Sequence, residues 1–133
     1  MPGLDWSYVT ELAAEPQSAG RARDFVCLHL AAHQLSHLAE AVRSVVSELA
    51  TNAVVHAGTP FSVTLSSEDG CVRLAVRDGA TSTPVRSTPG ELETCGRGLV
   101  LVEMLSRQWG VSPDREGGKS VWATFSATSL SIA

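Results

Sequence analysis

The stretch from residue 45 to residue 58, VVSELATNAVVHAG, constrains the fold more than any other part of the chain. Its apolar residues recur at helical spacing, and with the residues before them they form one apolar arc. The arc comprises Leu38, Val42, Val45, Val46, Leu49 and Ala53. Gly58 and Pro60 then follow in the order that is typical of a helix C-terminus. The sequence therefore predicts a helix that begins near Ser36, ends before Gly58 and packs one face against a core.

Three polar residues of this helix, Glu48, Asn52 and His56, recur every four positions and form a row. On a helical projection Glu48 lies at the edge of the apolar arc, and Asn52 and His56 fall within it. A carboxylate and an amide at the rim of a core need partners, because burying an unpaired polar group is costly. Two interpretations stay open. One is a structural network, for instance Asn52 bonded to a neighbouring loop, and the other is a cation or phosphate site on a rigid helix.

Composition narrows the class of protein. A chain of 133 residues with 44% hydrophobic and 18% charged residues is typical of one soluble globular domain. Its net charge of −4, with a single lysine and no basic run, makes direct nucleic-acid binding an unlikely role. No apolar run is long enough for a membrane span, and the first residues lack a signal-peptide pattern, so we expect a cytoplasmic protein without membrane contact. Cys27, Cys71 and Cys95 are far apart and suggest neither disulfides nor a zinc site.

The first third of the chain predicts a strand over residues 5–13 and a helix from Ser18 to about His33, with Ser18 as its N-cap. The residues expected on the buried face of this helix are Ala22, Phe25, Val26, His29 and Ala32. His29, His33 and His37 are spaced by four, which is compatible with a metal site. We favour histidines of the core or surface, because a joint at Ser36 would turn His37 away from the other two.

The middle of the chain predicts an antiparallel hairpin. Apolar residues alternate over residues 61–65 and in part over residues 72–76, and Asp69-Gly70 lies between these segments. Residues 81–95 are rich in Ser, Thr, Pro and Gly and predict a loop. A loop of this length in a compact domain usually has a function.

The last third predicts a helix over residues 98–109 that ends at Gly110, a strand from Val111, and a final strand over residues 119–125. The element order is then β-α-α-β-β-α-β-β. It predicts an α+β two-layer sandwich, with three helices on one face of a mixed, mostly antiparallel sheet. We expect residues 1–133 to form a single domain with a frayed tail over residues 126–133.

Four stretches, in matching order and spacing, resemble the GHKL ATP-binding superfamily, whose domain has the Bergerat fold. Residues 48–53 (ELATNA) resemble its N-box, and residues 76–79 (VRDG) end a predicted strand where the superfamily has its adenine-binding aspartate. Residues 96–99 (GRGL) open a predicted helix where it has a second glycine box, and residues 117–125 (GGKSVWATF) resemble its closing strand. The resemblance covers nearly the whole chain and is strongest to the small RsbW-like anti-sigma-factor serine kinases.

The resemblance implies ATP and Mg²⁺ as cofactors. It also implies which residues would bind the adenine base and which would bind the phosphates. Asp78 would accept a hydrogen bond from the adenine amine, with Gly79 beside it. The family pattern Asp-x-Gly-x-Gly is not complete here, since Ala80 and Ser82 stand at its two glycine positions.

The glycine box would bind the phosphates. Gly96 and Gly98 would offer backbone N–H groups at a helix N-terminus, with Arg97 and Leu99 as neighbouring contacts. For Arg97 a solvated surface role is the alternative. Residues 81–95 would correspond to the ATP lid.

Three further residues have implied roles in the resemblance. Asn52 would ligate Mg²⁺ through its amide oxygen, and Glu48 would orient or deprotonate the attacking nucleophile. Thr124 would support the adenine pocket, with simple packing in the strand as the alternative.

The implied function is an ATP-dependent protein serine/threonine kinase. It would transfer the γ-phosphate to a serine of an anti-anti-sigma (STAS) protein and would also sequester a sigma factor. A homodimer is compatible with the resemblance. The alternatives are a regulatory module that binds ATP without transferring phosphate and a plain ATPase subunit. A histidine autokinase is disfavoured, because no phosphoacceptor helices precede the domain.

Overall fold

The computed structural model describes residues 5–79, 100–113 and 117–127, and every structural statement below concerns those residues. Its elements in chain order are β1 (Trp6–Leu12), α1 (Ser18–Ala32), a 3₁₀ turn (Ser36–Leu38), α2 (Ala39–Asn52), a π-helical turn (Ala53–Ala57), β2 (Phe61–Glu68), β3 (Cys71–Asp78), a helical segment over residues 100–105, β4 (Gln108–Pro113) and β5 (Lys119–Ser126). The predicted order of elements is confirmed.

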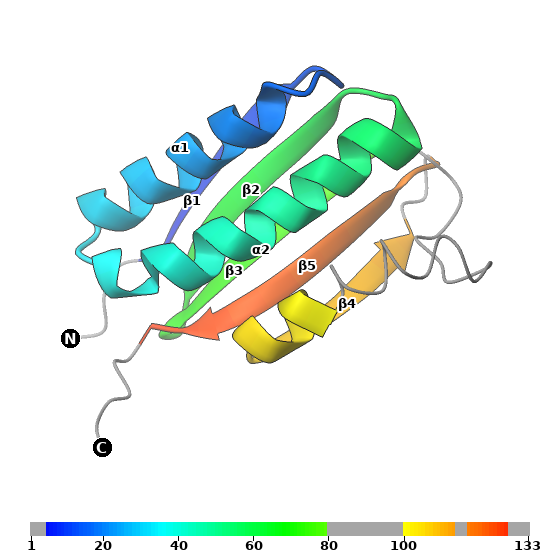
Figure 1. The fold of residues 1–133 in the computed structure, drawn as a ribbon. Helices are drawn as coiled ribbons and strands as arrows, with labels where there is room; N and C mark the ends of the chain where they lie inside the picture. Colours follow the sequence, from blue (N-terminus) through cyan, green and yellow to red (C-terminus); the bar gives the residue numbers. More distant parts are fainter. Residues whose placement is uncertain (1–4, 80–99, 114–116, 128–133) are drawn as a thin grey trace.

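The five strands form one sheet in the order β1-β2-β3-β5-β4. Helices α1 and α2 lie side by side across one face of it (Figure 1). The segment 100–105 contributes Val102 to the core between this sheet face and the helices. The predicted α+β two-layer architecture is therefore confirmed. The sheet is not mixed, because all four strand pairings are antiparallel.

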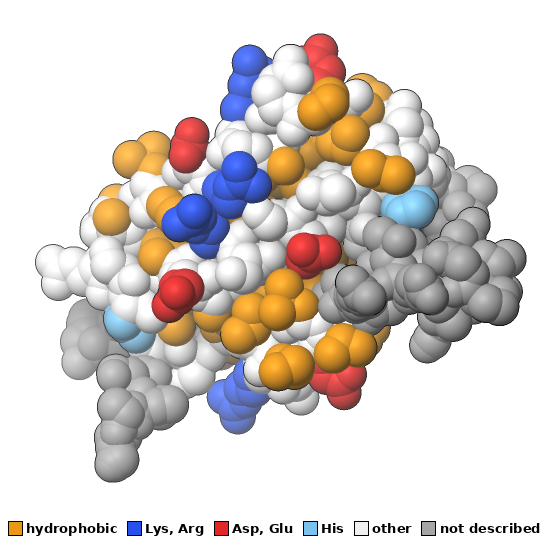
Figure 2. Space-filling view, viewed as in Figure 1, with side chains coloured by type: hydrophobic (Ala, Val, Ile, Leu, Met, Phe, Trp, Pro, Cys, Tyr) orange, Lys and Arg blue, Asp and Glu red, His pale blue; other side chains and the backbone are white. Residues whose placement is uncertain are grey.

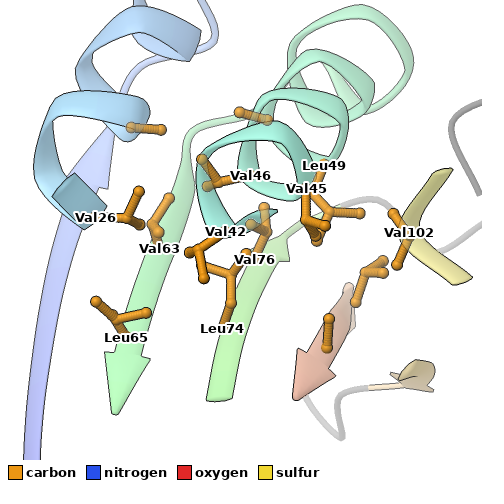
Figure 3. Packing of buried hydrophobic residues seen from close by; sticks show 14 of the residues in the cluster. Val26, Val42, Val45, Val46, Leu49, Val63, Leu65, Leu74, Val76 and Val102 are labelled. Atoms are coloured by element: carbon orange, nitrogen blue, oxygen red, sulfur yellow. The ribbon is translucent and has the colours of Figure 1, made fainter. Parts of the chain in front are cut away.

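The core lies between the sheet and the helices. Side chains alternate along β2, β3 and β5, so that Val63, Leu65, Leu74 and Val76 face the helices and are buried. From α2, the predicted arc residues Val42, Val45, Val46 and Leu49 meet them, and Val102 closes the side next to β5 (Figure 3). Complete burial of each of these side chains is worth about 1.5–3 kcal/mol, so packing on this face fixes the position of α2.

The end of α2 differs from a regular helix. After Asn52 the backbone widens into a π-helical turn that ends at Gly58, which has φ +66° and is in the left-handed region. A π turn shifts the phase of the residues that follow it. The prediction that His56 lies within the buried arc is therefore wrong, because His56 is exposed.

Helix α1 has most of its predicted inner face. Ala22 and Val26 are buried and Phe25 and His29 are half-buried, as is consistent with the prediction, whereas Ala32 is exposed and Leu30 is buried in addition. Ser18 does not cap the helix; its buried hydroxyl donates to the carbonyl oxygen of Ala13 (2.7 Å) and ties α1 to the end of β1.

The histidines of α1 belong to an aromatic cluster. The His29 ring stacks on Tyr8 at 3.8 Å between centroids, and the His33 ring stacks on Trp6 at 4.2 Å. The Tyr8 hydroxyl hydrogen-bonds to Nε2 of His33 (2.7 Å). Among the described residues no group of three His, Cys, Asp or Glu side chains could hold a metal ion.

The prediction for residues 98–109 is wrong at its C-terminal end. The helical segment ends at residue 105, and Trp109 and Gly110 belong to β4. Gly110 is required there by its neighbour on β5, since a Cβ at this position would lie 2.6 Å from the ring of Trp122. The Trp122 ring lies on the sheet face away from the helices, where the Arg73 guanidinium carbon is 5.4 Å from its centroid.

Candidate functional site

The end of the sheet next to the end of α2 holds Asp78. This residue is the last of β3, and it pairs with Phe61, the first of β2, and with Lys119, the first of β5. The π-helical turn after α2 contacts β3, so these ends meet in one corner of the molecule (Figure 1). Asp78 is on the helix side of the sheet and is 5% exposed.

The Asp78 carboxylate is paired with the only lysine of the sequence. Nζ of Lys119 donates to both carboxylate oxygens, at 3.0 Å each. The side chains are 9% exposed for Lys119 and 6% for Asp78. A buried carboxylate is costly without such a partner, so the strand register places the compensating charge directly opposite.

Backbone contacts hold the residues around this ion pair. The Gly79 N–H donates to Oγ1 of Thr59 (3.0 Å), which links the end of β3 to the loop after α2. Gly118 has φ +94°, and a Cβ on it would lie 2.3 Å from the carbonyl oxygen of Asp78. The corner therefore depends on glycine at position 118.

Helix α2 carries the other two polar candidates. Asn52 is its last residue and Glu48 lies one turn earlier; both are half-buried. Neither side chain makes a hydrogen bond or ion pair with another described residue, so both remain available to a ligand. Within the described residues Asn52 makes no side-chain hydrogen bond to a neighbouring loop, so the interpretation of Asn52 as part of a structural network has no support there.

Glu48 lines a groove of roughly 400 Å³ between α1, α2 and the segment 100–105. The lining residues are Arg23, Glu40, Arg43, Ser44, Ser47, Glu48 and Leu101. Nη1 of Arg23 donates to Oγ of Ser47 (2.9 Å), the residue before Glu48 on α2. Figure 2 shows basic and acidic side chains interspersed over α1 and α2, and hydrophobic side chains gathered over the segment 100–105. The groove thus combines two carboxylates, Glu40 and Glu48, with two cations, Arg23 and Arg43.

Other predicted site residues are not brought together with these. Thr124 lies on the sheet face away from the helices, opposite Arg73, and its hydroxyl donates weakly to the carbonyl of Gln108 (3.5 Å). Because side chains alternate along β5, Thr124 and Lys119 point to opposite faces. The predicted lid (residues 81–95) and the phosphate contacts Gly96, Arg97, Gly98 and Leu99 lie outside the described residues.

Sequence reasoning missed Lys119, Thr59 and Gly118 around Asp78, and Arg23 and Arg43 in the groove. The lysine had one available clue, because a lone lysine next to two glycines at the start of a buried strand is unusual. The position of Arg23 depends on how α1 packs on α2 and has no local clue. None of the helices in the described ranges is long and apolar enough to cross a membrane.

Comparison with known proteins identifies the type of domain. The chain resembles the crystal structure of the RsbU and RsbW domains of Rv1364c from Mycobacterium tuberculosis, with a TM-score of 0.71 and 21% sequence identity. That match covers 91% of this chain but only 32% of the other, so this chain spans about a third of that protein, and the likeness concerns the fold. No curated protein matches the sequence.

The family comparison covers almost the whole chain. The model of the histidine kinase-like ATPase domain matches residues 12–125, a range that contains α2, Asp78 and the start of β5. This match agrees with the resemblance to the GHKL superfamily that the sequence motifs indicated. The chain belongs to the histidine kinase-like ATPase domain family.

Proposed function

We propose that this domain binds Mg·ATP and acts as a regulatory protein serine kinase, which phosphorylates an anti-anti-sigma (STAS) protein and sequesters a sigma factor. The observation that carries the proposal is the placement of Glu48 and Asn52 one turn apart on α2, whose C-terminal end meets buried Asp78 at the end of β3. Membership of an ATPase domain family supports nucleotide binding. The serine specificity and the partners rest on the resemblance alone.

The residues present fit this ligand. Asp78 is an acceptor in a buried corner, which suits the exocyclic amine of adenine. Asn52 offers an amide oxygen that no other described side chain occupies, and Mg²⁺ prefers oxygen ligands. Bound Mg²⁺ would neutralise phosphate charge, and a single protein ligand is enough for it because phosphates and water supply the others.

Glu48 would act on the nucleophile. Its carboxylate lines an open groove, so the serine hydroxyl of a partner can reach it from solvent. Accepting the hydroxyl proton would raise the nucleophilicity of that oxygen. Arg23, Arg43 and Glu40 line the same groove and offer contacts of both signs to a partner segment around its serine.

One observation favours a second candidate function, a regulatory module that binds ATP without transferring phosphate. The glycine pattern after Asp78 is incomplete, since Ala80 and Ser82 stand at its two glycine positions. A plain ATPase subunit has no specific observation in its favour.

Calorimetric titration with ATP and Mg²⁺ tests the nucleotide part of the proposal. We expect saturable heat with ATP and weaker binding of GTP, because Asp78 accepts from an amine that guanine does not present at that position. Asn52→Ala should weaken Mg·ATP about tenfold or more, since it removes the proposed metal ligand, and should leave metal-free ATP nearly unaffected. Thr51→Ala, an exposed neighbour, is the control. The absence of heat at millimolar ATP would reject the proposal.

A further inference from the structure

The Lys119–Asp78 pair has an additional consequence for ligand binding, which rests on the proposed nucleotide site. Nζ of Lys119 is equidistant from the two carboxylate oxygens, 3.0 Å from each, and therefore lies on the open edge of the carboxylate. An amine of a purine base that donates to Asp78 would approach the same edge. The lysine and the base thus compete for one acceptor.

We propose that Lys119 is an affinity-determining residue that competes with the base, so that nucleotide binding exchanges the partner of Asp78 from the lysine ammonium to the base amine. Asp78 and Lys119 are paired residues of β3 and β5, so the strand register keeps the lysine within reach of the carboxylate. The paired strands β3 and β5 hold the two backbones in place. Movement of the flexible lysine side chain would therefore withdraw the ammonium from the carboxylate.

Only molecules in which Lys119 has left Asp78 can bind the base. The apparent affinity for the nucleotide is therefore the intrinsic affinity multiplied by the fraction of such molecules. If the lysine leaves the carboxylate in about one molecule in ten, the apparent affinity is about tenfold lower than the intrinsic one. The domain would therefore respond to a high nucleotide concentration and remain empty at a low one.

The first experiment removes the competitor and keeps the length of its side chain. Lys119→Met should bind ATP roughly tenfold more tightly than the parent, measured by calorimetry. Its unliganded form should melt at a lower temperature, because the buried Asp78 carboxylate loses its ion pair with Lys119, and ATP should raise its melting temperature more than that of the parent. Arg73→Met is the matched control, since it removes one positive charge from the opposite sheet face.

The second experiment uses the parent protein and does not require the variant to fold. Lys119 is the only lysine, so a sample grown with isotope-labelled lysine gives one side-chain NMR resonance. Saturating ATP should shift this resonance toward its position in Asp78→Asn, where the ion pair is absent.

The outcomes separate this inference from the proposed function. If the parent binds ATP while Lys119→Met binds equally or more weakly, or if the lysine resonance does not move, the exchange is wrong and the nucleotide site stands. If neither protein binds ATP, the proposed function fails and the exchange with it.

Discussion

Gly118→Ala should cost this domain a large part of its stability. The residue has φ +94°, which an L side chain rarely adopts, and its Cβ would lie 2.3 Å from the carbonyl oxygen of Asp78 and 3.1 Å from Cα of Gly79. The obstacle is backbone, so no rotamer change relieves it, and β5 must move away from β3. We expect a loss of about 3 kcal/mol or more from a total that is typically 5–15 kcal/mol. The melting temperature should fall by roughly 10 °C or more.

Thermal and urea denaturation measure this loss, and Gly20→Ala provides the control. Gly20 lies in α1, where a Cβ would meet only the end of the Arg23 side chain, at 3.5 Å. Alanine is the better helix former, so this variant should be unchanged or more stable by up to about 1 kcal/mol. A Gly118→Ala protein that melts within one or two degrees of the parent would show that the corner around Asp78 is less tightly packed than described.

Glu48→Gln should separate phosphate transfer from nucleotide binding. The amide keeps the shape of the side chain but cannot accept a proton from the attacking hydroxyl. Transfer from labelled ATP to a STAS-protein substrate should fall by roughly 10²-fold or more, the usual scale for a lost general base. ATP affinity should stay the same or rise slightly, because one negative charge near the phosphates is removed.

Glu40→Gln is the matched control for this experiment. Glu40 lines the same groove and its loss changes the net charge equally, but it lies two turns before Glu48 on α2. Its transfer rate should stay close to that of the parent. Unfolding or loss of ATP binding in Glu48→Gln would make Glu48 a structural residue. A parent that binds ATP and a sigma factor but transfers no phosphate would favour the non-catalytic regulatory module.

Sequence patterns correctly predicted the elements whose conformation depends on residues close in sequence. The period of Val42, Val45, Val46 and Leu49 predicted α2 and its buried face, and the structure buries all four. The turn at Asp69-Gly70 predicted the hairpin of β2 and β3. Both features depend on contacts close in sequence or on a simple apolar period.

The errors arose where contacts between residues far apart in sequence decide the local secondary structure or the burial of a side chain. Trp109 fits a helical stripe as well as a strand, and Gly110 resembles a helix stop; only the Trp122 ring across the strand pair explains why glycine stands there. His56 was misplaced because the π turn depends on packing that the sequence period does not encode.

The candidate site was predictable only in part. Glu48, Asn52 and Asp78 stood out through the resemblance, and the structure places the first two on α2 and the third at the end of β3. The partner of Asp78 is 41 residues away in sequence, and strand register alone brings it opposite. Side chains alternate along β5, and Lys119 points toward the helices. Thr124, five residues later, must therefore point to the opposite face, away from Asp78.

The buried pair of opposite charges also bears on how the chain finds its fold. Strands β3 and β5 are joined by a long connection, so nothing local aligns them, and apolar residues at alternate positions would tolerate a shift of two. Such a shift would place Lys119 opposite Val76 or move Asp78 opposite Val121, and each would bury an uncompensated charge. A shift of one would turn the whole inner row of β5 to the outside. The two charges therefore disfavour misaligned sheets, and folding of a variant that lacks both should be less discriminating even where its native state is equally stable.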